Sequence, residues 1–220
     1  MKRRGLTLVK VVVVLGIIIV LAVFWFPIFV NHSKTSAYRA SCQSNLKQIG
    51  LGFAQYSQDY EERFPPISIS AVASSTQPYP KPYGWADAIQ LYFKSTEIYH
   101  CLSLKKQTDY TTENRQNDAV HSYFVDYYYN TNLDGVLLEK APNPTMLVLC
   151  GEGNDGTDGT DARYNRNVIP QAWIETANSP ARRHFDYANY LFADGHVKAF
   201  KPEKIKSTRG NATDYSFAIK

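Results

Sequence analysis

The first sixty residues carry two successive hydrophobic patterns, and the first of them is a continuous apolar run. From Val11 to Val30, twenty consecutive residues carry no charge, and nearly all are aliphatic or aromatic. A helix of that length measures about 30 Å, which is the thickness of the hydrocarbon core of a bilayer. The run therefore predicts a transmembrane helix. The basic residues Lys2, Arg3 and Arg4 precede it, so the N-terminus is expected in the cytoplasm and the remainder outside it.

Other kinds of N-terminal signal fit this run less well. A cleaved secretory signal has a shorter apolar region followed by a small-residue cleavage site, and residues 24–30 (FWFPIFV) offer no such site. The pair Arg3-Arg4 is also found in twin-arginine signals, but again no cleavage site follows. A plain, uncleaved membrane anchor stays open as an alternative.

The second pattern predicts an amphipathic continuation of the same helix. Apolar residues return at spacings of three and four, which places them on one helical face. Pro27 is expected to kink the helix without ending it, since helices in a bilayer tolerate proline, whereas Phe64-Pro65-Pro66 is expected to stop it. The predicted apolar stripe, facing a globular head, consists of Tyr38, Cys42, Leu46, Ile49, Phe53, Tyr56 and Tyr60.

The remaining residues predict a small α+β head with an antiparallel sheet. A short helix is expected over residues 85–93, and strands over residues 123–129 and 146–150. Residues 189–200 (NYLFADGHVKAF) predict a hairpin, with Asp194-Gly195 in a type I′ turn. Loops are expected over residues 67–82 and 107–117.

The charge of the chain excludes one class of partner. The formal net charge is +4, and the three basic residues before the apolar run supply most of it, leaving 21 basic and 20 acidic residues. A nearly neutral head gives no support for nucleic-acid binding.

Three cysteines lie in the part predicted to be exported. An oxidising compartment permits a disulfide there, and the odd number leaves at least one thiol unpaired or paired between chains. We predict a disulfide between Cys42 and Cys101, with Cys150 in a buried strand. No CxxC spacing occurs, so the sequence gives little support for a zinc site.

An acidic loop is the candidate for a metal site. Carboxylates separated by glycines can wrap around Ca²⁺, and residues 152–161 contain Glu152, Asn154, Asp155, Asp158 and Asp161. The spacing is not that of an EF-hand, so a solvated turn is the favoured interpretation. A calcium site formed by Asp155, Asp158 and Asp161 is the alternative, and no other cofactor is expected.

A histidine cluster near the C-terminus could suggest catalysis. His184, Asp194 and His196 have no nucleophile motif or phosphate-binding loop beside them, and Asp194 suits the turn for local reasons. We therefore predict that the protein is not an enzyme. His184 is instead expected to hydrogen-bond to the hairpin backbone and to hold the C-terminal segment on the head.

The N-terminus resembles a prepilin-type signal, that of the type IV pilin and type II secretion pseudopilin superfamily. The resemblance rests on the basic leader, Gly5, Leu6-Thr7-Leu8-Val9 and the long apolar run. It implies that a prepilin peptidase cleaves between Gly5 and Leu6 and that Leu6 is N-methylated. Leu6 replaces the usual phenylalanine, and Lys10 replaces a glutamate thought to neutralise the N-terminal amine of a neighbouring subunit. Relatives lacking that carboxylate tend to be minor or tip subunits, so a minor subunit is expected.

Further motifs resemble the DUF1559 branch of prepilin-like proteins. These are residues 42–50 (CQSNLKQIG), residues 60–66 (YEERFPP), Gly84-Trp85 with Cys101 after it, and a histidine followed by nine residues and Asp-Gly. The last motif is His184 with Asp194-Gly195. Leu102 stands where the family often has proline.

The resemblance implies a pilin-like organisation and a structural role in the bacterial inner membrane. It consists of a leader (residues 1–5), a transmembrane half-helix (6–30), an amphipathic half-helix (31–62) and an extracytoplasmic α+β head (63–220). The implied function is assembly into a type IV pilus or type II secretion pseudopilus. The implied partners are prepilin peptidase, an inner-membrane assembly platform, other pilin-like subunits and the lipid bilayer. The alternatives are an uncleaved, membrane-anchored binding domain that does not polymerise and, least favoured, an anchored hydrolase.

Overall fold

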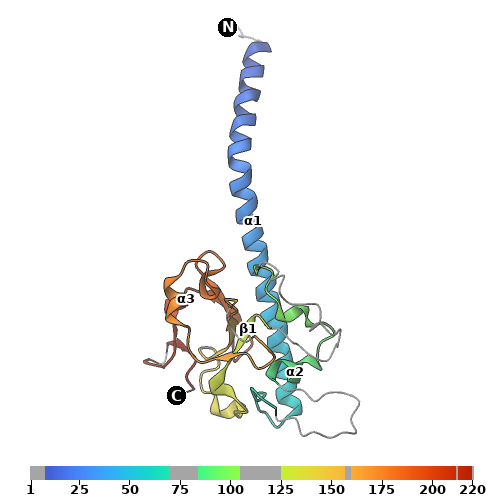
Figure 1. The fold of residues 1–220 in the computed structure, drawn as a ribbon, viewed down its shortest axis with the longest axis vertical. Coiled ribbons are helices and arrows are strands. Elements are labelled where there is room, and N and C mark those ends of the chain that lie inside the picture. The colour runs from blue at the N-terminus through green and yellow to red at the C-terminus, as the bar shows by residue number, and fades with distance from the viewer. Residues whose placement is uncertain (1–7, 70–83, 105–124, 157–159, 212, 220) are drawn as a thin grey trace, which may run out of the picture. The chain divides into compact units, whose positions relative to one another are not determined.

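The fold is known from a computed structural model, which describes residues 8–69, 84–104, 125–156, 160–211 and 213–219. The chain divides into two compact units, Met1–Ala37 and Tyr38–Lys220. A single helix, α1 (Leu8–Asp59), contributes residues to both units (Figure 1). The predicted leader and the predicted loop over residues 107–117 lie outside the described residues, as does most of the predicted loop over residues 67–82.

The first unit contains the apolar part of α1. Residues Leu8–Phe26 have a mean hydropathy of 3.0, and none of this stretch is buried. The helix continues without interruption past residue 27, as expected of a proline within an apolar helix. A helix of this length and composition can serve as a membrane anchor or as a signal sequence.

The second unit begins with the amphipathic part of α1, whose predicted stripe is largely confirmed. Five of its seven residues are buried in the core: Cys42, Leu46, Ile49, Phe53 and Tyr56. The two at its ends, Tyr38 and Tyr60, are 40% and 48% exposed. The helix ends at Asp59, earlier than the predicted residue 62, because Glu61 and Glu62 adopt left-handed backbone angles (φ 53° and 55°). The chain has therefore left the helix before it reaches Phe64-Pro65-Pro66.

A five-stranded sheet forms the centre of the head, in the order β3-β1-β2-β4-β5. The expectation of an antiparallel sheet was wrong in part, because β1 pairs with β3 in parallel and the sheet is mixed. The other neighbours pair antiparallel. A second, two-stranded sheet pairs β6 with β7 in parallel. The strands are β1 (Tyr127–Asn130), β2 (Val148–Glu152), β3 (Asn165–Arg166), β4 (Ala188–Phe192), β5 (Val197–Phe200), β6 (Ile205–Lys206) and β7 (Tyr215–Ser216).

Strand β1 is covered on both faces, which is why all four of its residues are buried. Neighbouring side chains of a strand point to opposite faces. Tyr129 stacks on Phe53 of α1 at 5.2 Å between ring centroids, while Tyr128 packs against Trp173 of helix α3 (Gln171–Glu175) at 6.5 Å. Figure 1 shows β1 between these two helices. Helix α2 (Trp85–Gln90), shorter than the predicted 85–93, adds Trp85, which stacks on Phe53.

The predicted hairpin is confirmed as β4 and β5, but the predicted type I′ turn is wrong. A type I′ turn needs positive φ at both central residues. Here Gly195 has φ 84°, whereas Asp194 is not among the residues with positive φ. The Gly195 N–H donates to Phe192 O at 2.8 Å, and the Phe192 N–H donates to His196 O at 2.9 Å. The connection is thus a three-residue loop with glycine in the left-handed position, and the Asp194 carboxylate accepts a hydrogen bond from the His196 N–H.

Candidate functional site

Four side chains with metal-ligating or redox chemistry meet inside the head. They are Cys42, Cys101, Glu152 and His184, and one ligand atom from each lies within 4.8 Å of all the others. Cys42 and His184 are fully buried, and Cys101 and Glu152 are 3% and 1% exposed. The two sulfurs are 2.7 Å apart, and Cys101 Sγ is 3.9 Å from His184 Nε2. We name this set the Cys–His–Glu cluster.

The two cysteines reach the cluster from elements far apart in the sequence. Cys42 lies on the buried stripe of α1, so the helical repeat itself points its thiol into the head. Cys101 follows the 3₁₀ helix η1 (Thr96–Tyr99), and its backbone N–H donates to Asp126 Oδ2 at 2.8 Å. The predicted disulfide between them stays a prediction, and Cys150 lies fully buried in β2 as expected.

Glu152 is the last residue of β2 and is held by an extensive set of hydrogen bonds. Its Oε2 accepts the backbone N–H of Asn189 at 2.9 Å, and its Oε1 accepts the Asn189 side-chain amide at 2.8 Å. The same Oε1 lies 2.9 Å from His184 Nε2. A buried carboxylate without such partners would cost several kcal/mol, so Asn189 is a structural requirement for Glu152.

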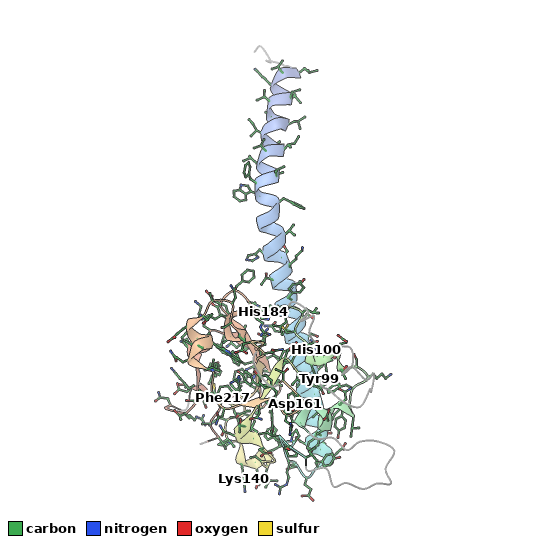
Figure 2. The ribbon with its side chains drawn as sticks, in the orientation of Figure 1. Tyr99, His100, Lys140, Asp161, His184 and Phe217 are labelled. Carbon is green, nitrogen blue, oxygen red and sulfur yellow. The ribbon has the colours of Figure 1, made fainter. Side chains whose placement is uncertain are left out.

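A tight turn before β4 presents His184, which is one of the residues labelled in Figure 2. His184 pairs with Tyr187 through backbone hydrogen bonds, and the two residues between them, Phe185 and Asp186, adopt φ of 55° and 65°. The other ring nitrogen, Nδ1, lies 3.3 Å from Ser103 Oγ. Each ring nitrogen of His184 therefore has a polar neighbour: Nε2 faces the cluster, and Nδ1 faces the Ser103 hydroxyl.

The two thiols of the cluster have pKa values that are shifted in opposite directions. The hydrogen bond between the sulfurs lowers the pKa of Cys101 and raises the pKa of Cys42. Burial lowers the pKa of His184, but hydrogen bonds with Cys101 and Glu152 outweigh it and raise that pKa to about 9. The raised pKa favours the protonated imidazole, and its Nε2 lies 2.9 Å from Glu152 Oε1, within ion-pair distance.

A second layer of polar groups surrounds the cluster. Arg183 donates to the carbonyl oxygens of Gly153 and Asn154, and the positive charge of its guanidinium helps to lower the pKa of Cys101. Asp126 accepts from the Asn154 amide at 2.7 Å and lies 3.6 Å from His100 Nδ1. Burial raises the pKa of Asp126, but these hydrogen bonds lower it to below its ordinary value.

The acidic residues grouped in the sequence take different places in the structure. Asp155 accepts a hydrogen bond from Trp173 Nε1 at 2.9 Å, and Asp161 forms an ion pair with Arg163 at 2.7 Å. The Glu152 side chain belongs to the Cys–His–Glu cluster and is not grouped with the other acidic residues of the loop. Asp158 lies outside the described residues, so the predicted calcium site stays a prediction without structural support from the rest of the loop.

The residues of the C-terminal motif, His184 and Asp194-Gly195, also occupy different places in the structure. Asp194 and Gly195 form the hairpin loop, where Asp194 pairs with His196 at 2.5 Å. The expectation that His184 hydrogen-bonds to the hairpin backbone was wrong: its described side-chain contacts are to Cys101, Ser103 and Glu152. Gly5 and Leu6, the predicted processing site, lie outside the described residues.

The Cys–His–Glu cluster as a unit was not predicted from the sequence. Its four ligand atoms come from residues 42 to 184 and follow no short spacing motif. One signal was present: Glu152 comes at the end of an apolar strand, where a buried charged side chain needs polar partners. No sequence pattern marked the neighbouring polar residues Ser103, Arg183 and Asn189 as part of the site.

A comparison with protein families found one match. A family model described as "Protein of unknown function (DUF1559)" matches residues 32–124. The match supports a relation to the DUF1559 family. It spans less than half of the chain and includes Cys42 and Cys101, whereas Glu152, His184 and the Asp-Gly motif lie beyond it. Neither the curated proteins nor the solved structures yielded a match.

Proposed function

We propose that the protein is a prepilin-like structural subunit, anchored in the bacterial inner membrane with its head outside the cytoplasm. The observation that supports this proposal most strongly is a single uninterrupted helix, whose first part is apolar from Val11 to Phe26 and whose last part supplies core residues of the head. Such a helix stores the subunit in the bilayer. It can later exchange its lipid contacts for contacts with other copies of the same apolar surface.

The proposed life cycle has three steps. Prepilin peptidase cleaves after Gly5 and leaves Leu6 as an N-methylated terminus. An assembly platform then extracts the subunit from the membrane. In the resulting pilus or pseudopilus the apolar half-helices pack together and the heads face outward. The subunit performs no chemistry in these steps.

Lys10 favours a second candidate function. In a bundle of apolar helices a lysine lies close to the N-terminal amine of a neighbour, and two like charges in a low-dielectric environment repel each other. An uncleaved, anchored binding domain avoids this cost because it never polymerises. Within the first proposal, Lys10 instead points to a minor subunit that occurs once or a few times per filament.

The charge reversal Lys10→Glu separates the two candidates. We propose to measure the fraction of the full-length chain that is recovered in sheared extracellular filaments from its native host. For a filament subunit, Lys10→Glu should leave this fraction unchanged or raise it, and the wild-type chain should itself be present. The matched reversal Lys204→Glu, at an exposed position of the head, controls for the change of net charge. Absence of the chain from filaments in all three forms would favour the anchored binding domain.

A further inference from the structure

The Cys–His–Glu cluster holds two thiols, an imidazole and a carboxylate, and all four are buried in the head. We propose that this cluster binds one Zn²⁺ ion through Cys42 Sγ, Cys101 Sγ, His184 Nε2 and a carboxylate oxygen of Glu152. The proposal does not depend on whether the protein polymerises.

The donor set is suited to zinc in type and number. Structural zinc sites hold four ligands in a tetrahedron, most often drawn from cysteine and histidine, and carboxylate oxygen is a third accepted ligand. Soft thiolates exclude Ca²⁺ and Mg²⁺, which prefer sites made of oxygen alone. The four side chains leave no coordination position for water, which is the arrangement of a structural site and not of a catalytic one.

The distances require a small adjustment. Two thiolates bound tetrahedrally at about 2.3 Å from zinc lie about 3.8 Å from each other. The sulfurs, now 2.7 Å apart, would therefore separate by about 1 Å. A second edge fits more closely, since Cys101 Sγ lies 3.9 Å from His184 Nε2 where a tetrahedral site has about 3.6 Å. On a third edge, His184 Nε2 and Glu152 Oε1 lie 2.9 Å apart and would separate by about 0.4 Å.

The surrounding hydrogen bonds orient two ligands as a metal requires. With Nε2 bound to zinc, the neutral imidazole carries its proton on Nδ1, where Ser103 Oγ lies 3.3 Å away and can accept it. Zinc would replace the proton now shared between His184 Nε2 and Glu152 Oε1. Asn189 continues to donate its backbone N–H to Glu152 Oε2 and so fixes the carboxylate.

The charges of the filled site cancel. Two thiolates and one carboxylate carry three negative charges, and these balance Zn²⁺ together with the Arg183 guanidinium beside Cys101. Three uncompensated negative charges in a buried site would be strongly unfavourable. The bound ion would tie α1 to the segment after η1, to β2 and to the turn before β4. Zinc would therefore hold the amphipathic half-helix onto the head.

The test uses the full-length chain, purified in detergent without chelators or added reductant. Elemental mass spectrometry should find about one zinc per chain. After denaturation with a chelator, all three cysteines should react with a thiol reagent. Co²⁺ added to the chelator-stripped protein as CoCl₂ should give the sulfur-to-cobalt charge-transfer and visible bands of a tetrahedral thiolate site.

Variants assign the ligands. Cys101→Ser and His184→Gln should lose the zinc, and Glu152→Gln, which keeps the side chain's volume, should weaken zinc binding by at least about tenfold. The matched control Cys150→Ala removes a buried thiol of β2 outside the cluster and should retain one zinc per chain. Because ligand variants can fail to fold, the Co²⁺ spectrum of the wild-type chain stands as an independent measurement.

Two results would overturn the proposal. One is a single reactive thiol after denaturation, with a mass 2 Da below that of the reduced chain, because Cys42 and Cys101 would then form the predicted disulfide. The other is three reactive thiols with no zinc bound, even after ZnCl₂ is added to the reduced protein.

Discussion

Replacing Phe53 with alanine tests the inference that the last part of α1 belongs to the core of the head. Phe53 is 2% exposed and packs in a triangle with two aromatic rings, 5.6 Å from Trp85 and 5.2 Å from Tyr129, which lie 5.7 Å from each other. These contacts join α1 both to α2 and to strand β1 of the five-stranded sheet. The substitution therefore removes the residue at which three elements meet.

The expected loss can be worked from these contacts. A buried phenylalanine ring withdraws at least about 150 Å² from water, and at about 25 cal/mol per Å² the transfer term lost is about 3 kcal/mol once the remaining methyl group is allowed for. Two aromatic contacts add about 0.5–1.5 kcal/mol each. The sum is about 4–6 kcal/mol, which overlaps the upper part of the range of about 3–5 kcal/mol for Phe→Ala substitutions in other cores.

The assay is urea unfolding of the detergent-solubilised chain, followed by near-ultraviolet circular dichroism of the head. With a denaturant slope of about 2 kcal/mol per molar urea, the midpoint should fall by about 2–3 M. Leu51 provides the matched control, since it lies on the same helix but is 60% exposed, and Leu51→Ala should cost less than about 0.5 kcal/mol. Equal midpoint shifts for the two variants would refute the reasoning, because the helix would then contribute no specific buried face.

Two further predictions concern the packing of α2 and the charge of Asp126. A Cβ atom at Gly84 would collide with the backbone carbonyl of Ala162, so Gly84→Ala should destabilise the head by about 1–3 kcal/mol, whereas Gly16→Ala, which meets open space, should leave urea unfolding of the head unchanged. Asp126 has a folded-state pKa below its ordinary value, so its stabilising contribution is present above about pH 4 and is lost as the pH falls through the folded pKa. Urea midpoints measured from about pH 6 to about pH 2 should therefore fall less steeply for Asp126→Asn than for wild type, and an identical slope would contradict the assignment.

The elements that follow from local periodicity were predictable from the sequence. The stripe from Cys42 to Tyr56 was found because helical spacing depends only on the order of residues, and the hairpin was found because alternation and a glycine turn are local signals. The end of α1 was misplaced by three residues. Its stop comes from left-handed angles at Glu61 and Glu62, a conformation that glutamate adopts only in context.

The features that depend on distant contacts could not be predicted in this way. The parallel pairing of β1 with β3 joins Tyr129 to Asn165, and two-residue strands such as β3 have no recognisable pattern. The Cys–His–Glu cluster depends even more on distant contacts, because its members come from four separate segments of the chain that only the tertiary fold brings together. His184 was recognised as part of a motif, but its partner Glu152 was assigned to the neighbouring acidic loop.

The mass of the N-terminal peptide of the mature protein, taken from its native membrane, tests the central claim most directly. The proposed pathway predicts a peptide that begins at Leu6 and carries one added methyl group. A peptide that still begins at Met1 would contradict the prepilin-like function and leave an uncleaved, membrane-anchored domain.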